Sequence, residues 1–186
     1  MIPPTPSRSP LRSAPLCTLV TLVAAASLAA CGPAPVPTPT PTAAFASEEE
    51  AFAAAEATYR AYTDALNAVD PADPETFEAT YAYSSGTFQE ADRENFSTMH
   101  AEKYTIEGDA VVAKFVGEQA ADPFDIVVAT VCVDVSAVRV LDSDGNSVVN
   151  PNRPDIYEIR ATFERNDGRL LVDEVERIEG TTCAAP

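Results

Sequence analysis

The sequence predicts an α+β domain in which N-terminal helices pack on a curved antiparallel β-sheet. Apolar residues recur with a helical period between residues 47 and 100. From residue 103 onward the apolar residues alternate with the period of a strand. Helices followed by strands in this order are typical of an α+β layer packing, with the helices on one face of the sheet. We assign this domain to residues 47–186.

The first predicted helix begins at Ser47 and runs for about twenty residues. Ser47 and Glu50 have the spacing of a capping box, which satisfies two free amides at a helix start. Phe52 and Tyr59 follow at a spacing of seven and mark the apolar stripe of this helix. The residue before Pro71 ends it, because proline disfavours a helical residue in front of it.

Two shorter helices are predicted next. Pro74 suits the first position of the second helix, and Gly86 marks its end. The third helix is predicted to begin at Thr87, which forms another capping box with Glu90, and to end near His100.

Six segments after residue 103 are predicted strands. They are 104–106, 110–116, 124–135, 137–141, 156–164 and 170–178. The first two are predicted to pair as a hairpin. Segment 124–135 is apolar on both faces, so we expect it to be central in the sheet and covered on both sides in its middle. In segment 156–164 the odd positions are expected to point inward and the even positions outward.

Residues 1–30 are predicted to be a lipoprotein signal peptide. Arg8 and Arg12 precede an apolar run from residue 16 to residue 30, which is short for a membrane span of about 20 residues. The run ends in LAAC at Cys31, which resembles the lipobox of bacterial lipoproteins. We expect cleavage before Cys31 and acyl chains such as palmitate attached to that residue, holding the mature protein on the extracytoplasmic face of the cell membrane. An ordinary signal peptide with an incidental cysteine is the alternative.

Residues 31–46 are predicted to be the lipidated cysteine and an extended tether. Five prolines alternate with small residues in this stretch: Pro33, Pro35, Pro37, Pro39 and Pro41. Proline fixes φ and donates no amide hydrogen, so the stretch should adopt polyproline II and reach roughly 30 Å. We interpret it as a stalk; a ligand for a proline-recognising partner is the alternative.

The charge of the chain is strongly acidic. The formal net charge is −17, and Arg8 and Arg12 are the charged residues that precede Cys31. The mature part therefore holds 10 basic and 29 acidic residues, a net charge of −19. Such a surface repels phosphates, so we expect no nucleic-acid partner. We interpret the charge as solubility outside the cell, with a cation-rich partner as the alternative.

Two cysteines remain after lipidation of Cys31. Cys132 and Cys183 are an even pair in an oxidising compartment, which predicts a structural disulfide. It would close a loop of about 50 residues and stabilise the fold by about 4 kcal/mol in the chain-entropy model. Free thiols or a metal site are the alternatives, but no histidine lies at ligand spacing, so we expect no metal and no cofactor.

Four features of the domain carry a resemblance to a known family. They are the order of elements, the segment CVDVS that begins at Cys132, the turn at Asp144-Gly145 and the near-terminal Cys183. In these features the domain resembles the NTF2-like superfamily, in particular its actinobacterial lipoprotein members. The resemblance covers residues 47–183. It implies a cystatin-like cone, with the sheet wrapped around the long helix and a pocket at the wide end. The superfamily includes isomerases, polyketide cyclases, dehydratases and non-catalytic binding modules, and the fold alone does not choose among them.

Four residues are candidates for a pocket in such a domain. Tyr59, Tyr62 and Tyr81 could line a cavity, although aromatics at helical spacing also pack in cores. Asp134 lies late in a strand with apolar neighbours and could be a pocket base with a raised pKa. Its alternative place is the rim of the sheet, in water or capping a turn.

These observations lead us to expect a non-catalytic extracytoplasmic domain that binds a cell-envelope protein or a small apolar ligand. One alternative is an isomerase-type or cyclase-type enzyme that uses a pocket acid. Another is a structural envelope module that forms a homodimer through Tyr157, Ile159 and Phe163, if those side chains are exposed. The identity of the ligand, the oligomeric state and the pathway stay open.

Overall fold

The structure is a computed structural model, and it describes residues 45–179 and residue 183. The chain divides into two units, Met1–Pro39 and Thr40–Pro186, and all described residues belong to the second unit. The predicted signal peptide, the predicted lipidation site Cys31 and most of the predicted tether therefore lie outside the described residues.

The described part of the chain contains four helical segments and six strands. In chain order they are α1 (Glu48–Asn67), the 3-10 helix η1 (Pro74–Phe77), α2 (Glu78–Tyr81), α3 (Gly86–Ala101), β1 (Thr105–Glu107), β2 (Val111–Ala120), β3 (Ile126–Asp134), β4 (Arg139–Leu141), β5 (Ile156–Asn166) and β6 (Arg169–Arg177).

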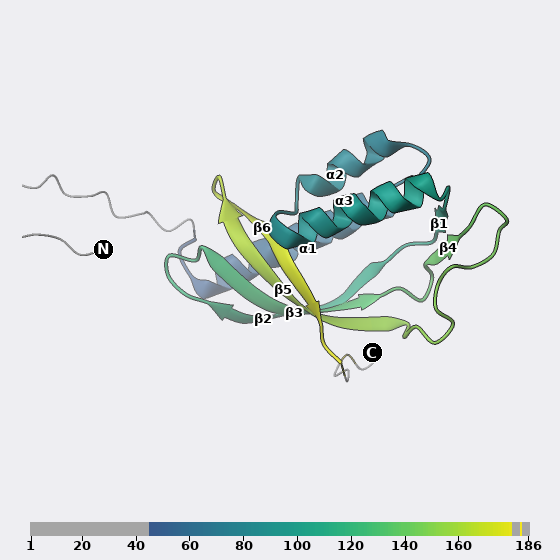
Figure 1. The fold of residues 1–186 in the computed structure, drawn as a ribbon. Coiled ribbons are helices and arrows are strands. Elements are labelled where there is room, and N and C mark those ends of the chain that lie inside the picture. The colour runs from purple at the N-terminus through teal and green to yellow at the C-terminus, as the bar shows by residue number, and fades with distance from the viewer. Residues whose placement is uncertain (1–44, 180–182, 184–186) are drawn as a thin grey trace, which may run out of the picture. The chain divides into compact units, whose positions relative to one another are not determined.

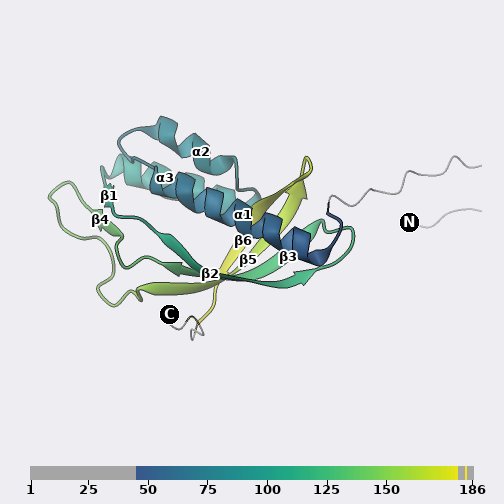
Figure 2. The ribbon, with the colours of Figure 1, turned by 180° about the vertical axis from the view of Figure 1, so that it is seen from behind.

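The helices cover one face of an antiparallel sheet. The sheet has the strand order β2-β3-β5-β6, and β1 pairs with β4 in a separate two-stranded sheet. Helices α1 and α3 lie on the same side of the four-stranded sheet in two opposite views (Figures 1 and 2). The predicted α+β fold class, with N-terminal helices on an antiparallel sheet, is confirmed.

Helix α1 begins as the sequence predicts. The Ser47 hydroxyl accepts a hydrogen bond from the Glu50 amide, and the Glu50 carboxylate accepts one from the Ala46 amide at 2.7 Å. The first turns of the buried side of the helix carry small residues, with Ala51 and Ala55 fully buried. Small side chains at these positions let the helix axis approach the strands closely.

The second and third helices differ from the prediction. The second is broken into η1 and the short α2, and the third has Ser85 as its N-cap rather than a capping box at Thr87. The cause is a long-range contact, because the Ser85 amide donates to the carbonyl of Val172 in β6 at 2.8 Å. The Ser85 hydroxyl donates to Asp173 at 3.0 Å, so β6 fixes where α3 starts.

The predicted hairpin of 104–106 with 110–116 is wrong. β1 pairs with β4, and β2 pairs with β3. The Asn67 side chain accepts a hydrogen bond from the Ala110 amide and donates to the Ala110 carbonyl, both at 2.9 Å. Because the amide side chain of Asn67 satisfies both backbone groups, Ala110 has no need of a strand partner.

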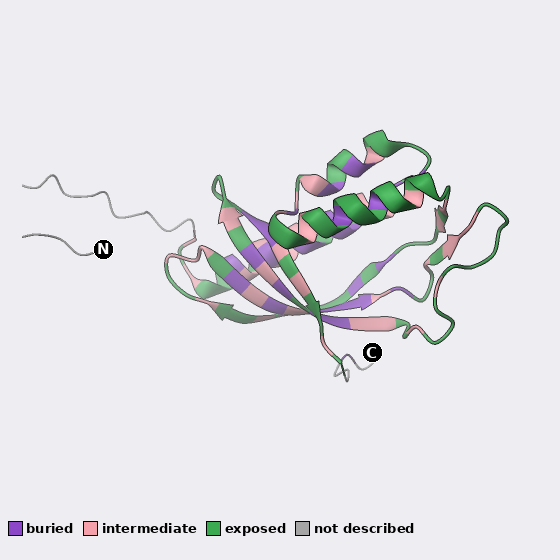
Figure 3. Cartoon of the chain, in the orientation of Figure 1, coloured by how far each residue is buried: buried purple, intermediate pink, exposed green. Residues whose placement is uncertain are grey.

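The core lies between the helices and the inner face of β3 and β5. Val127, Val131 and Phe163 are almost completely buried there, and the alternation predicted for β5 is confirmed on its inner face. Segment 124–135 is central as predicted, since β3 lies between β2 and β5. Figure 3 shows the alternation of buried and less buried residues along these strands.

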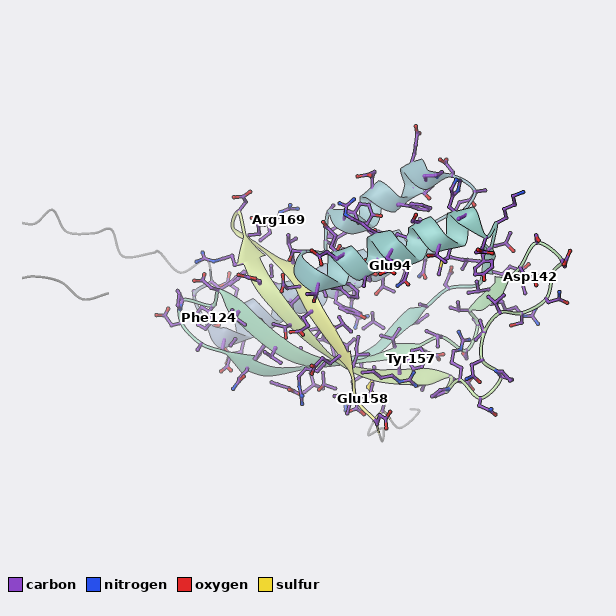
Figure 4. All side chains as sticks on the ribbon, viewed as in Figure 1. Glu94, Phe124, Asp142, Tyr157, Glu158 and Arg169 are labelled. Carbon is purple, nitrogen blue, oxygen red and sulfur yellow. A yellow bond between two sulfur atoms is a disulfide. The ribbon has the colours of Figure 1, made fainter. Side chains whose placement is uncertain are left out.

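A disulfide between Cys132 and Cys183 ties the C-terminal segment to the outer face of the sheet, opposite the helices. Cys183 also donates its backbone amide to the Glu158 carboxylate at 3.2 Å. Glu158, labelled in Figure 4, is buried although its position in β5 points outward, and the contact with Cys183 explains the exception. The predicted disulfide is confirmed.

Candidate functional site

A buried acid and two tyrosines form the most unusual polar cluster of the described domain. The Tyr62 hydroxyl on α1 lies 3.0 Å from each carboxylate oxygen of Asp92 on α3. Both side chains are buried, with 4% of Tyr62 and 6% of Asp92 exposed. The Tyr59 ring lies 6.0 Å from the Tyr62 ring and contacts Phe163 of the sheet edge-on. The cluster thus joins both long helices to the core.

Burial changes the acid–base properties of this cluster. It raises the pKa of Asp92 from 3.8 to about 6, while the hydrogen bond from Tyr62 opposes part of that rise. Burial and the nearby Asp92 charge also raise the pKa values of Tyr59 and Tyr62, so both phenols stay protonated at neutral pH. Within the described residues no lysine or arginine forms an ion pair with Asp92.

Tyr81 lies at the edge of a neighbouring apolar cluster. Its ring is 6.3 Å from the ring of Phe96, and the Arg93 guanidinium lies 3.8 Å above its centre. Burial raises the pKa of Tyr81, and Arg93 opposes this shift. The ring contacts of the three predicted tyrosines are with other aromatic rings and, for Tyr81, with Arg93, as in core packing.

Asp134 is not a pocket acid. Its carboxylate accepts a hydrogen bond from the Ser136 amide at 2.8 Å, where β3 ends and the chain turns. Hydrogen bonding to the Ser136 side chain, and then to its amide, lowers the pKa of Asp134, whereas a pocket base would need a raised pKa. The interpretation of Asp134 as a pocket base is therefore wrong, and the alternative holds: the carboxylate lies at a strand end and caps the following turn. Asp92 is the buried acid that the prediction missed.

Of four open pockets among the described residues, three contain acidic side chains. One lies between α1 and β2, with Asp64 and Asp109 in its wall. Two adjoining ones lie on the outer side of β2 and β3, with Glu118 in both. The formal net charge of −17 makes acidic linings the ordinary case.

The fourth pocket, which we call the hairpin pocket, has no acidic lining residue. It has a volume of about 290 Å³. Its walls come from α1, from the segment before α3 and from the turn between β5 and β6. The lining residues are Phe45, Ala54, Ala57, Thr58, Tyr83, Gly168, Arg169, Leu170 and Leu171.

Contacts to the core hold the walls of the hairpin pocket in place. The Thr58 hydroxyl donates to the Leu170 carbonyl at 3.0 Å and joins α1 to β6. The Tyr83 carbonyl accepts a hydrogen bond from the Val172 amide at 2.9 Å. Phe45, which lies within the predicted tether, packs against the main core. Contacts within the protein therefore fix the walls of the pocket.

The sheet face proposed for dimerisation does not have the exposure that it requires. Phe163 is fully buried and Ile159 is 8% exposed, because the helices cover them. The exposed apolar side chains of the sheet lie on its outer face, where Val116 is 41% and Ile126 is 57% exposed. Beside them Arg160 forms an ion pair with Glu118 at 3.4 Å.

Residues 45–179 and 183 contain neither a cluster of metal-ligating side chains nor a membrane-spanning helix. No group of three or more histidine, cysteine, aspartate or glutamate side chains in this part of the chain is arranged to hold a metal ion. No helix of the same part is both long and apolar enough to cross a membrane.

Comparison with known proteins assigns no family. No protein-family model matches the chain, and no curated protein matches it. Among solved structures, the intermembrane space region of the chloroplast protein ARC6 aligns with a TM-score of 0.49 and 11% identity, over 68% of this chain and 95% of that one. A de novo designed β-sheet protein solved by NMR aligns with a TM-score of 0.36 and 16% identity, over 72% of this chain and 93% of that one. Neither likeness bears on function.

Proposed function

We propose that the chain is an exported bacterial lipoprotein, anchored to the extracytoplasmic face of the cell membrane through Cys31, whose folded domain binds a partner without catalysing a reaction. The partner is a small apolar ligand or a cell-envelope protein. The observation that carries the proposed location is the Cys132–Cys183 disulfide, read together with the lipobox that ends at Cys31. Structural disulfides persist in oxidising compartments and are rare in the cytosol.

Binding is favoured over catalysis by the way the polar groups are distributed. The acid with the raised pKa, Asp92, is packed among aromatic side chains, and none of the four pockets includes it. The hairpin pocket offers apolar walls and one cationic side chain but no acid that could act as a base. Apolar pockets with few polar groups are typical of ligand-binding sites.

We also propose membership of the NTF2-like superfamily, in the group of actinobacterial lipoproteins. Support comes from the order of elements, with a long first helix lying across a sheet of antiparallel strands. The Cys132–Cys183 pair, part of the sequence resemblance, adds to it.

The proposed anchor is tested by membrane fractionation of cells that produce the full-length chain. The wild-type protein is expected in the membrane fraction with an acylated Cys31 as its first residue. Cys31→Ser should prevent acylation and processing, whereas Cys17→Ser, which changes a residue of the part removed at cleavage, should leave both intact. Equal processing of Cys31→Ser and wild type would overturn the anchor.

The proposed binding role is tested by native mass spectrometry of the protein released from membranes, together with crosslinking in intact cells. A bound small molecule or a defined crosslinked envelope protein is expected. A domain that carries neither, and that converts a small molecule instead, would contradict the proposal.

A second candidate function is an isomerase-type or cyclase-type enzyme, and the Asp92–Tyr62 pair is the observation that favours it. A carboxyl group with a pKa of about 6 beside a phenol could exchange a proton with a substrate. Such an enzyme requires a substrate that reaches Asp92. A ligand that shifts the carboxyl NMR signal of Asp92 would support this candidate, and a signal unaffected by any bound ligand would exclude it.

A third candidate is a homodimer through the outer face of the sheet, which the exposure of Val116 and Ile126 favours. Sedimentation of the solubilised protein tests it. A dimer that Ile126→Glu dissociates would support this candidate, and a monomer at high concentration would exclude it.

A further inference from the structure

We infer that the hairpin pocket binds a free alkyl carboxylate of medium chain length, with the chain against the apolar wall and the carboxylate at Arg169. This inference rests on the proposed binding function and names the class of ligand.

The wall of the hairpin pocket is apolar and belongs to the fixed part of the domain. Leu170 is 2% and Leu171 is 9% exposed, so packing within the protein, and not the ligand, fixes the positions of both side chains. Ala54 and Ala57 present small side chains from α1, which leaves room beside the helix. An alkyl chain placed here loses contact with water without reshaping the protein.

The positive charge of the lining favours a ligand with an anionic head group. Arg169 is the one cationic residue of the lining and starts β6 beside the turn of the hairpin (Figure 4). Within the described residues its guanidinium forms no ion pair, unlike Arg60, Arg160 and Arg165. The guanidinium fork matches the two oxygens of a carboxylate.

The overall negative charge does not prevent anion binding at this place. Exposed charges more than about 8 Å away are largely screened at physiological salt. The charges close to the pocket therefore dominate: Arg169 lines it, and Asp167 of the same turn is exposed and outside the lining. The other three pockets each contain an acidic side chain: Asp64 and Asp109, Glu48 and Glu118, or Glu118 alone. The arginines of two of them, Arg60 and Arg160, already form ion pairs with Glu56 and Glu118.

The volume of the hairpin pocket limits the length of the alkyl chain that it can hold. Its volume of about 290 Å³ lies at the lower end of the roughly 300–1,000 Å³ that is usual for ligand sites. A single short chain fits this space, whereas a diacyl lipid does not. A free carboxylate is therefore the better candidate than a phospholipid.

The test is photo-crosslinking of the full-length protein in its own membranes, with an octanoate analogue that carries a diazirine on its chain. Peptide mapping is expected to place the label on residues 54–58 and 168–171, and free octanoate should compete for it. Octanol, octylamine and phosphatidylglycerol vesicles are the competing probes that separate head-group charge and lipid source from chain length.

Three variants make the test specific. Arg169→Gln should reduce labelling at least about tenfold, because a charge-assisted hydrogen bond is lost. Ala57→Phe should abolish labelling by filling the pocket from an exposed helix position. Arg139→Gln removes an exposed arginine of β4 outside the pocket and should label like wild type. Unchanged thermal unfolding midpoints and intact disulfides show that the variants are folded.

The outcomes separate this inference from the proposed function. Labelling that survives both Arg169→Gln and Ala57→Phe, or that octanol competes as well as octanoate does, overturns the carboxylate site. A membrane-anchored protein that binds an envelope partner and is not labelled at the hairpin pocket also overturns it, while the proposed function stands. A protein that is absent from the membrane fraction refutes the proposed function first.

Discussion

Replacing Asp92 with asparagine should stabilise the domain at neutral pH and leave its stability unchanged in acid. The pKa of Asp92 is raised from 3.8 to about 6 by burial. Between pH 3.8 and about 6, the Asp92 carboxyl is protonated in the native state and ionised in the unfolded state. The contribution of Asp92 to the free energy of unfolding is therefore highest below pH 4 and falls as the pH rises through about 6.

The size of this effect follows from the shift. A rise from 3.8 to about 6 corresponds to at most about 3 kcal/mol of unfavourable charge burial. Asp92 lies on α3, whose outer side is exposed to water, and screening should reduce the effect to about 1–2 kcal/mol (Figure 3). Asparagine keeps an oxygen that accepts the Tyr62 hydrogen bond and carries no charge.

The assay is urea unfolding of wild type and Asp92→Asn at a series of pH values from acid to neutral. Tyr62→Phe supplies the opposite test, because it leaves the buried carboxylate without its phenol donor and should destabilise the domain by about 1–3 kcal/mol at neutral pH. Glu94→Gln changes an exposed carboxylate of the same helix (Figure 4) and should alter stability by less than about 0.5 kcal/mol. An Asp92→Asn protein that is less stable than wild type at neutral pH, or that differs from it equally at all pH values, would refute this reasoning.

Three further predictions concern stability. Removing the disulfide by replacing Cys132 and Cys183 with serine should cost about 4 kcal/mol in chemical denaturation, since the bridge spans 51 residues; reduced wild type should match the double variant. Gly117→Ala should cost about 1–3 kcal/mol, because a Cβ there would lie 2.4 Å from the ring of Phe52, and Phe52→Leu in the same chain should recover part of the loss measured by thermal unfolding. Asn67→Ala should cost about 1–3 kcal/mol and speed amide exchange at the start of β2, because a backbone donor and acceptor lose their partner; exchange as slow as in wild type would contradict it.

Elements with local signals could be predicted from the sequence. The start of α1 is set by Ser47 and Glu50, three residues apart, and the inner face of β5 is set by strict alternation. The start of α3 and the pairing of β1 could not be predicted in this way. Ser85 is held by Val172, and Ala110 by Asn67, so contacts between residues far apart in sequence decide both.

The candidate site was only partly visible in the sequence. Tyr59 and Tyr62 were singled out as candidates for a cavity wall, but the acid beside them was not. Phe88, Asp92 and Phe96 are spaced four residues apart, so Asp92 shares a helix face with two aromatic residues. That spacing was the available signal. The hairpin pocket carries no such signal, because residues from positions 45 to 171 meet only in the folded chain.

Intact-mass spectrometry of the native protein, isolated from the cells that produce it, tests the proposed lipoprotein identity most directly. The expected mass is that of a chain beginning at Cys31 with acyl chains attached and with Cys132 joined to Cys183. A chain that begins at Met1, is recovered from the cytosol and has its four cysteines reduced would contradict both the proposed location at the membrane and the proposed binding role.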